Sequence, residues 1–251
     1  MRTDRFAPLP PDAAASLYEG LAGEDDWRLI LPYIPDDRRG GALAILALMR
    51  ELEGVPARVS EPMLGNIRCQ WWRDALGEAF GPGPVRHHPL SVAIEATLGG
   101  DPEMSPPLRA MVEGAEAVLE LRDPCPPSDA ITAARGVWGA GAAALARWFG
   151  APEAANVASD AATAHAVLRL TNQDAQPVRT RSLPRLSDRL AAISLGEATG
   201  LIPPKPTAQV PDAALPAILP ATLIPAYTRG RTLSPLGKRA RYLAAMLRGC
   251  V

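Results

Sequence analysis

The chain has 251 residues, of which 47% are hydrophobic and 21% are charged, a balance typical of a globular protein. Alanine and leucine supply most of the apolar residues, while phenylalanine and tyrosine are scarce, so the composition predicts an all-α fold. The formal net charge of −1 gives the chain as a whole no electrostatic reason to bind nucleic acid.

The predicted helices follow one another closely and are separated by short connections rich in proline. Prolines fall between the apolar segments, where they end helices without interrupting them. No internal repeat or domain-scale change in composition occurs, so we expect one helical domain over residues 1–251, with a flexible start at 1–11 and a proline-rich linker at 202–211. The expected helices are 12–21, 25–33, 38–53, 61–76, 91–98, 108–121, 131–149, 151–172, 186–195, 212–227 and 235–250.

The helix expected at 61–76 combines a clear start with a dense apolar face. Ser60 is a suitable N-cap, and Pro62 stands where a missing N–H costs nothing. Helical spacing divides its residues into a side predicted to be buried and a side predicted to be wet. The charge of Arg68 falls on the apolar side, one turn before Trp72, which makes both residues pocket candidates. The predicted buried set is Leu64, Ile67, Arg68, Trp71, Trp72 and Ala75, and the wet set is Asn66, Gln70, Arg73 and Gly77.

Two later helices leave alternatives open. The helix at 131–149 contains Gly136, Gly139 and Gly141, and such glycines indicate either a tightly packed partner helix or room for a ligand. The helix at 151–172 has a polar face that includes Asp160 and Thr163. That face suits the lining of a cavity or an ordinary solvent-exposed surface.

The cysteines and the hydropathy pattern bear on location. Cys69, Cys125 and Cys250 lack any CxxC or metal-ligand spacing, which favours a reducing compartment over a disulfide scaffold or a zinc site. No uninterrupted run of about 18 apolar residues occurs, and no apolar leader precedes the first helix. We therefore expect a cytoplasmic protein.

The last predicted helix, 235–250, is amphipathic and basic. Its leucines lie opposite a set of cations. A terminal helix packed on the domain is the simpler interpretation of this pattern, and peripheral contact with an anionic membrane surface or an acidic partner is the alternative. The cations are Lys238, Arg239, Arg241 and Arg248.

Residues 59–76, with the sequence VSEPMLGNIRCQWWRDAL, resemble the squalene/phytoene synthase family. Further similarity lies in the small-residue helix at 134–150, in Leu170-Thr171-Asn172 followed by Arg181-Ser182-Leu183-Pro184, and in residues 215–221. The resemblance covers roughly residues 20 to 250 and is strongest to the branch that includes a mitochondrial respiratory complex I assembly factor. It implies a single-domain, isoprenoid-synthase-like helical bundle.

Active members of that family condense two prenyl diphosphates, using magnesium held by two aspartate-rich helical motifs. Carboxylates one helical turn apart can share such an octahedral cation. At the first motif this chain offers only Glu51 and Glu53, and at the second only Asn172 and Asp174. Glu53 and Asp174 are therefore the carboxylates left as metal candidates. Asp74 and Glu78 stand at i, i+4 but do not match the motif positions, so we expect an ordinary helix-surface pair.

Three functions follow from these observations. The first is a catalytically degenerate family member that needs no cofactor and binds a protein partner or an isoprenoid or other lipid-like ligand; the branch implies assembly of a respiratory complex. The second is a magnesium-dependent prenyltransferase. It is favoured if Glu51 and Glu53 face Asp160 and Asn172 across an open cavity. The third is a purely structural helical protein. The pocket candidates are Glu51, Glu53, Arg68, Trp72, Asp160 and Asn172.

Overall fold

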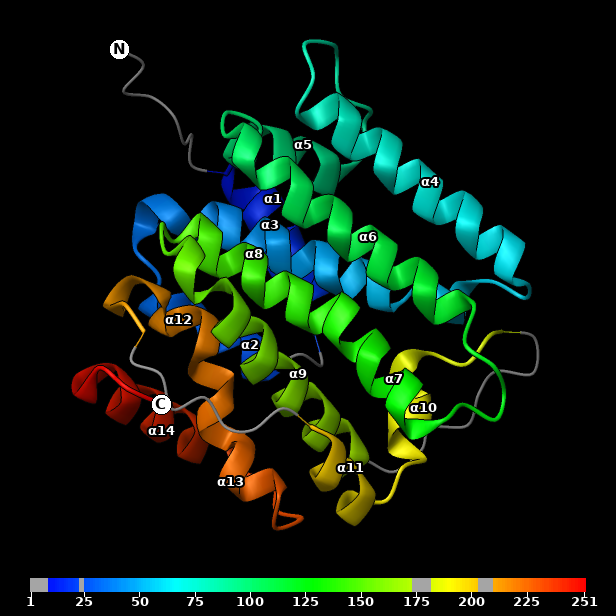
Figure 1. The fold of residues 1–251 in the computed structure, drawn as a ribbon. Helices are drawn as coiled ribbons and strands as arrows, with labels where there is room; N and C mark the ends of the chain where they lie inside the picture. The colour runs from blue at the N-terminus through cyan, green and yellow to red at the C-terminus, as the bar shows by residue number, and fades with distance from the viewer. Residues whose placement is uncertain (1–8, 23–24, 173–181, 203–209) are drawn as a thin grey trace.

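The computed structural model describes residues 9–22, 25–172, 182–202 and 210–251. Helices account for all the regular structure in these ranges (Figure 1), which confirms the predicted all-α class. Most of the predicted flexible start and linker lies outside the described residues. Several of the described helices end at a glycine, with Gly54, Gly99 and Gly249 as C-caps, as the sequence pattern indicates.

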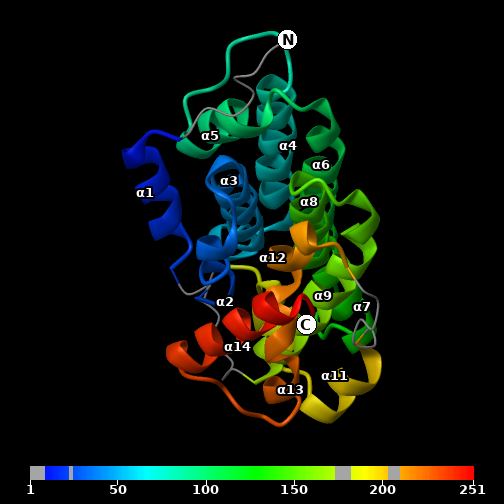
Figure 2. The same cartoon turned by 90° about the vertical axis from the view of Figure 1, so that its left-hand side faces the viewer.

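The first half of the chain is organised around α3. Its residues from Gly41 to Met49 are all buried, and Figure 2 shows α3 between α1 on one side and α4, α6 and α8 on the other. It packs directly against α1, α5, α6 and α8. The helices are α1 (Pro11–Gly20), α2 (Asp25–Arg28), α3 (Asp36–Glu53), α4 (Pro62–Ala79), α5 (Pro89–Leu98) and α6 (Ser105–Leu119).

The helix predicted at 131–149 forms as one continuous element with a π-helical segment inside it. It consists of α7 (Pro127–Ala134), η4 (Arg135–Gly139) and α8 (Ala140–Trp148), and α9 (Ala155–Thr171) packs against it. A Cβ at Gly114 of α6 would collide with the backbone of Gly136, and one at Gly141 would lie 2.6 Å from Met49 Sδ. The glycines therefore serve close helix packing, and neighbouring atoms fill the space that a ligand would need.

The last part of the chain is broken into short helices. The expected helix at 212–227 is interrupted because Pro216, Pro220 and Pro225 each remove a backbone donor. The elements are α10 (Leu186–Ala191), α11 (Leu195–Leu201), α12 (Leu215–Ile218), α13 (Ile224–Tyr227) and α14 (Pro235–Arg248). The 3-10 turns are η1 (Leu31–Tyr33), η2 (Pro56–Arg58), η3 (Pro102–Met104), η5 (Pro152–Ala154), η6 (Asp212–Ala214) and η7 (Leu219–Leu223).

The orientation predicted for α4 is partly wrong, although Trp72 and Ala75 are buried as predicted. Its N-cap is Glu61, and Leu64, Ile67 and Arg68 are exposed. The buried side instead carries small residues that allow close approach to α6: a Cβ at Gly65 would lie 2.6 Å from the Leu119 side chain. The prediction weighted large apolar residues, whereas the contact depends on small ones. The buried residues of α4 are Gly65, Cys69, Trp72, Ala75, Leu76 and Ala79.

A buried polar network joins α2 to the C-terminal helices. Asp26, 1% exposed, accepts a hydrogen bond from the Tyr227 hydroxyl at 2.7 Å, and its carboxylate lies 2.9 Å from His165 Nε2 and 2.5 Å from Lys238 Nζ. The Tyr242 hydroxyl donates to the Asp26 carbonyl oxygen at 3.0 Å. Burial alone would raise the pKa of Asp26, but these hydrogen bonds and charges outweigh it and hold the pKa well below its usual range.

This network fixes the position of α14, which lies at the outer edge of the molecule in both views (Figures 1 and 2). Lys238 and Tyr242 face inward toward Asp26, so the prediction that Lys238 belongs to an outward cationic face is wrong. Within the described ranges, no helix combines the length and apolar character needed to cross a bilayer.

Candidate functional site

Two adjoining cavities lie beside the C-terminal end of α3. The first, of about 470 Å³, opens between α1, α3, α5 and the turn η2. The second, of about 270 Å³, opens between α3 and α4. Glu51 and His88 line both cavities, so the two cavities share part of their walls.

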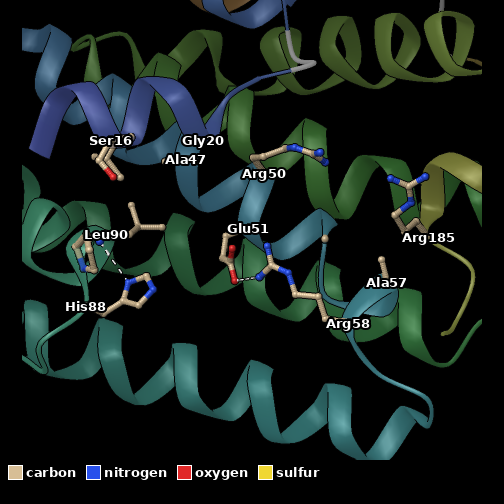
Figure 3. Close-up of a pocket in the computed structure, with 13 residues that line it drawn as sticks. Ser16, Gly20, Ala47, Arg50, Glu51, Ala57, Arg58, His88, Leu90 and Arg185 are labelled. Atoms are coloured by element: carbon tan, nitrogen blue, oxygen red, sulfur yellow. Dashed lines mark hydrogen bonds and ion pairs between the residues drawn. The ribbon is translucent and has the colours of Figure 1, made fainter. Parts of the chain in front are cut away.

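Guanidinium groups dominate the polar lining of the first cavity (Figure 3). Each belongs to an arginine paired with a carboxylate, and in every pair the carboxylate side chain is the more buried partner, with exposures of 25%, 4% and 11% against 45%, 33% and 29%. Glu53 and Asp188 do not line the cavity and lie behind their guanidiniums, whereas Glu51 lines the cavity beside Arg58. The pairs are Arg58 with Glu51, Arg50 with Glu53, and Arg185 with Asp188.

Aromatic rings form the wall of the second cavity. Trp71 and Trp72 meet edge to face with centroids 4.9 Å apart, and His88 lies 5.3 Å and 5.2 Å from them. The Nδ1 atom of His88 accepts the Leu90 backbone N–H at 3.3 Å and so caps α5. Burial lowers the pKa of His88, which keeps the imidazole neutral at pH 7. This wall is apolar and rigid, with Arg68 at its edge.

The structure brings three of the predicted pocket residues to these cavities. Glu51 lines both, while Arg68 and Trp72 line the second. Glu53 lies directly behind the first cavity, where it pairs with Arg50 and accepts a hydrogen bond from the Ser187 hydroxyl at 2.9 Å. The end of α3 and the middle of α4 thus meet at one site.

The other two predicted pocket residues lie elsewhere. Asp160 pairs with Arg135 at 2.6 Å, and the Asn172 amide donates to the carbonyl oxygens of Leu168 and Tyr227 at 2.6 Å and 2.8 Å. Neither residue lines either cavity. The polar face of α9 runs from the surface into the core, where Thr163 is fully buried. Asp174 falls outside the described residues.

The carboxylates among the described residues do not fit a shared magnesium ion. Glu51 and Glu53 are both engaged by guanidiniums, and in the part of the chain that the structure describes no three His, Cys, Asp or Glu residues are placed to hold a metal ion. The pair at 74 and 78 is also occupied: hydrogen bonds from Arg86 lower the pKa of Glu78 to about 2, and Asp74 accepts from Gln70 at 2.7 Å.

The sequence analysis missed the residues that give the first cavity its charge. Arg50 and Arg58 flank the candidate carboxylates, and the i, i+3 spacing of Arg50 and Glu53 is a usable signal for their pairing. Arg185 and Asp188 have the same i, i+3 spacing, but no local signal predicts that they lie near the end of α3. His88, in the loop before α5, was also not among the predicted pocket residues, and it lines both cavities.

A central helix enclosed by others, with adjoining cavities at its end, places the molecule among the isoprenoid-synthase-like helical bundles. Residues 25–201 match the squalene/phytoene synthase family, so the chain belongs to this family. The matched region contains the whole lining of the second cavity and all of the first except its α1 residues, and it ends before α12. No curated protein and no solved structure shows a significant match to the chain.

Proposed function

We propose that this chain is a family member without prenyltransferase activity that binds an amphiphile with an apolar chain and an anionic head group. The observation that carries this proposal is the union of a guanidinium-lined cavity with an aromatic one through Glu51 and His88. The first suits the head group, and the second suits an isoprenoid or acyl chain.

The arginines of the first cavity retain hydrogen-bond donors that an anionic head group can use. A guanidinium carries five N–H groups, and pairing with one carboxylate leaves several of them available. The carboxylates of Glu53 and Asp188, which do not line the cavity, fix the orientation of the Arg50 and Arg185 donors before the ligand arrives. An anion in the first cavity would accept charge-assisted hydrogen bonds without a large ordering cost.

The hydrocarbon chain of the ligand would lie against the rings of Trp71, Trp72 and His88. Aromatic faces and edges bury a large apolar area, and their edge-to-face contacts hold them in place. The combined space of the two cavities falls within the range of ordinary small-molecule sites. A branched or straight hydrocarbon chain matches this wall better than a polar ligand does.

The loss of catalysis follows from the pairing of the candidate carboxylates with arginines. A magnesium ion bridging a diphosphate needs carboxylate oxygens that are free to coordinate it, and guanidiniums hold those of Glu51 and Glu53. Asp160 lies in a separate ion pair on α9. Direct recognition of the anion by arginine then replaces the metal bridge, and no cofactor is required.

The test is calorimetric titration of the full chain with farnesyl diphosphate, first in EDTA and then with magnesium, followed by product analysis. We expect binding in EDTA and no product in either condition. Arg58→Gln and Trp71→Leu should each weaken binding roughly tenfold, equivalent to about 1.4 kcal/mol. Arg147→Gln, which changes an exposed arginine on α8, is the matched control and should bind as the unmodified chain does.

Two results would overturn this proposal. Magnesium-dependent formation of a condensed product, abolished by Glu53→Gln, would establish the prenyltransferase alternative. Absence of binding of farnesyl diphosphate and of a fatty acid such as palmitate would remove the amphiphile site itself.

A protein partner is a second candidate, favoured by the outward face of α4. Met63, Leu64 and Ile67 are 64%, 41% and 60% exposed there, an unusual apolar stripe for a solvent-facing helix. The resemblance to an assembly-factor branch suggests a role in assembling a respiratory complex.

In a strain that lacks the chain, we expect the double variant Met63→Ser/Leu64→Ser to fail to restore complex I activity while it still binds farnesyl diphosphate. Unchanged complex I activity in the strain lacking the chain would refute this role.

A further inference from the structure

The C-terminal region differs sharply in charge from the rest of the chain. From residue 213 to 251 the sequence contains six cationic and no acidic residues, although the whole chain has a net charge of −1. Lys238 is neutralised by the buried Asp26, and Arg241 donates to the Thr222 carbonyl oxygen. The four remaining cations are exposed, and they are Arg229, Arg231, Arg239 and Arg248.

The helix α14 presents an apolar stripe to solvent on the same region. Leu236, Leu243 and Leu247 are 77%, 50% and 79% exposed, and their spacing of i, i+7 and i+11 aligns them along one side. Tyr242 and Ala245 are buried on the opposite side. Because Tyr242 is tied to the Asp26 carbonyl oxygen, the helix cannot turn to bury its leucines.

A cationic groove adjoins this stripe. It has a volume of about 910 Å³, lies between α1, η1, α3 and α14, and is lined by Arg28, Arg39 and Arg239 without any carboxylate. Asp25 and Asp36 pair with Arg28 and Arg39 but do not line the groove. Arg239 belongs to α14 itself, so the groove and the leucine stripe form one continuous surface.

We propose that this surface binds an anionic phospholipid bilayer. The three leucines would enter the boundary between head groups and acyl chains, as the apolar face of an interfacial helix does. The exposed arginines would meet lipid phosphates, and the groove would receive one head group. Exposed leucines flanked by cations, with no acidic residue in the segment, fit an anionic bilayer better than they fit a soluble acidic protein.

The test is co-sedimentation of the full chain with vesicles of phosphatidylcholine alone and of phosphatidylcholine containing phosphatidylglycerol. We expect binding to the anionic vesicles that weakens as salt is raised. Leu243→Ser/Leu247→Ser should lower the partition coefficient at least about tenfold because both side chains lose their burial in the bilayer. Arg239→Gln/Arg248→Gln should lower it by a comparable amount, since each arginine contributes about fivefold.

Matched controls separate this surface from the rest of the molecule. Val92→Ser on α5 changes a side chain that is 46% exposed, and Arg147→Gln changes an exposed arginine on α8; neither should alter partitioning. Removal of α14 is not a clean test because it also removes Lys238 and Tyr242 from the buried network. Urea unfolding of each variant shows whether the fold is retained, as expected for exposed positions.

Three outcomes would overturn the proposal. One is equal binding to neutral and anionic vesicles, and another is unchanged partitioning of the double leucine variant. The third is loss of binding in Met63→Ser, which would transfer the membrane contact to α4.

Discussion

The buried network around Asp26 and the cavity at the end of α3 use the same chemical groups for different purposes. Each joins carboxylates to cationic side chains. Asp26 is 1% exposed, and its carboxylate contacts His165, Tyr227 and Lys238. In the cavity, the side chains of Arg58 and Glu51 are 45% and 25% exposed.

The contrast shows that burial decides what a charge pair does. A sealed carboxylate must be fully satisfied, because an unpaired charge in the interior is very costly. The Asp26 network therefore holds α2, α9, α13 and α14 in fixed positions. A half-exposed pair contributes little to stability because water screens it, and its remaining donors are available to a ligand.

Substitution of Asp26 should have the largest effect on stability. Asp26→Asn keeps the shape of the side chain but leaves Lys238 without its anionic partner, so we expect a loss of about 3–5 kcal/mol in the free energy of unfolding. Urea denaturation measures this loss. Asp25→Asn is the matched control, since that side chain is 64% exposed and should change stability by no more than about 0.5 kcal/mol. A loss below about 1 kcal/mol for Asp26→Asn would show that the network is not structural.

The same network should make stability depend on pH in a defined direction. The pKa of Asp26 is depressed in the folded state, so its contribution is present above its unfolded pKa of about 3.9 and is lost as the pH falls toward the folded value. The stability difference between the unmodified chain and Asp26→Asn should therefore shrink below about pH 4. Urea unfolding at a series of pH values tests this, and a difference that is constant down to pH 3, roughly one unit below the unfolded pKa, would contradict it.

The sequence predicted the longer helices well because their signals are local. Periodicity located α3, and proline and glycine marked the ends of its neighbours. The same approach misplaced part of the buried face of α4, since Gly65 and Cys69 are buried there while Leu64 and Ile67 are exposed. It also merged η6, α12, η7 and α13 into one helix, because three of the prolines were not weighed as breaks.

The candidate site was only partly accessible from the sequence for a related reason. Arg68 was found because its charge departs from the apolar side of its helix, and Trp72 because it lies one turn further on. Glu51 was found because it stands at the position of the family's first motif. Contacts between distant segments leave no such trace: the bond between Tyr242 and Asp26 spans 216 positions, and Ser187 meets Glu53 across 134. Asp160 was chosen from the polar face of its helix and Asn172 by family position, and neither lines the cavities at the end of α3.

The smallest stability effect is expected for the pair of Arg58 and Glu51. A double-mutant cycle with Arg58→Gln and Glu51→Gln should give a coupling energy of no more than about 1 kcal/mol in urea unfolding, because both groups are partly exposed. Their effects on farnesyl diphosphate binding should have opposite signs. Arg58→Gln removes donors and weakens binding, whereas Glu51→Gln removes a competing anion and should strengthen it about fivefold, equivalent to roughly 1 kcal/mol.

Coupling above about 2 kcal/mol, in the range of buried pairs, would place this pair in the same structural class as Asp26. Weaker binding in both variants would have a different meaning. It would show that Glu51 acts by orienting Arg58, so that the carboxylates paired with the guanidiniums contribute to affinity through preorganisation. Calorimetry of the two single variants in EDTA distinguishes these outcomes. Glu51→Gln strengthens binding if the carboxylate competes with the ligand, and it weakens binding if the carboxylate positions Arg58.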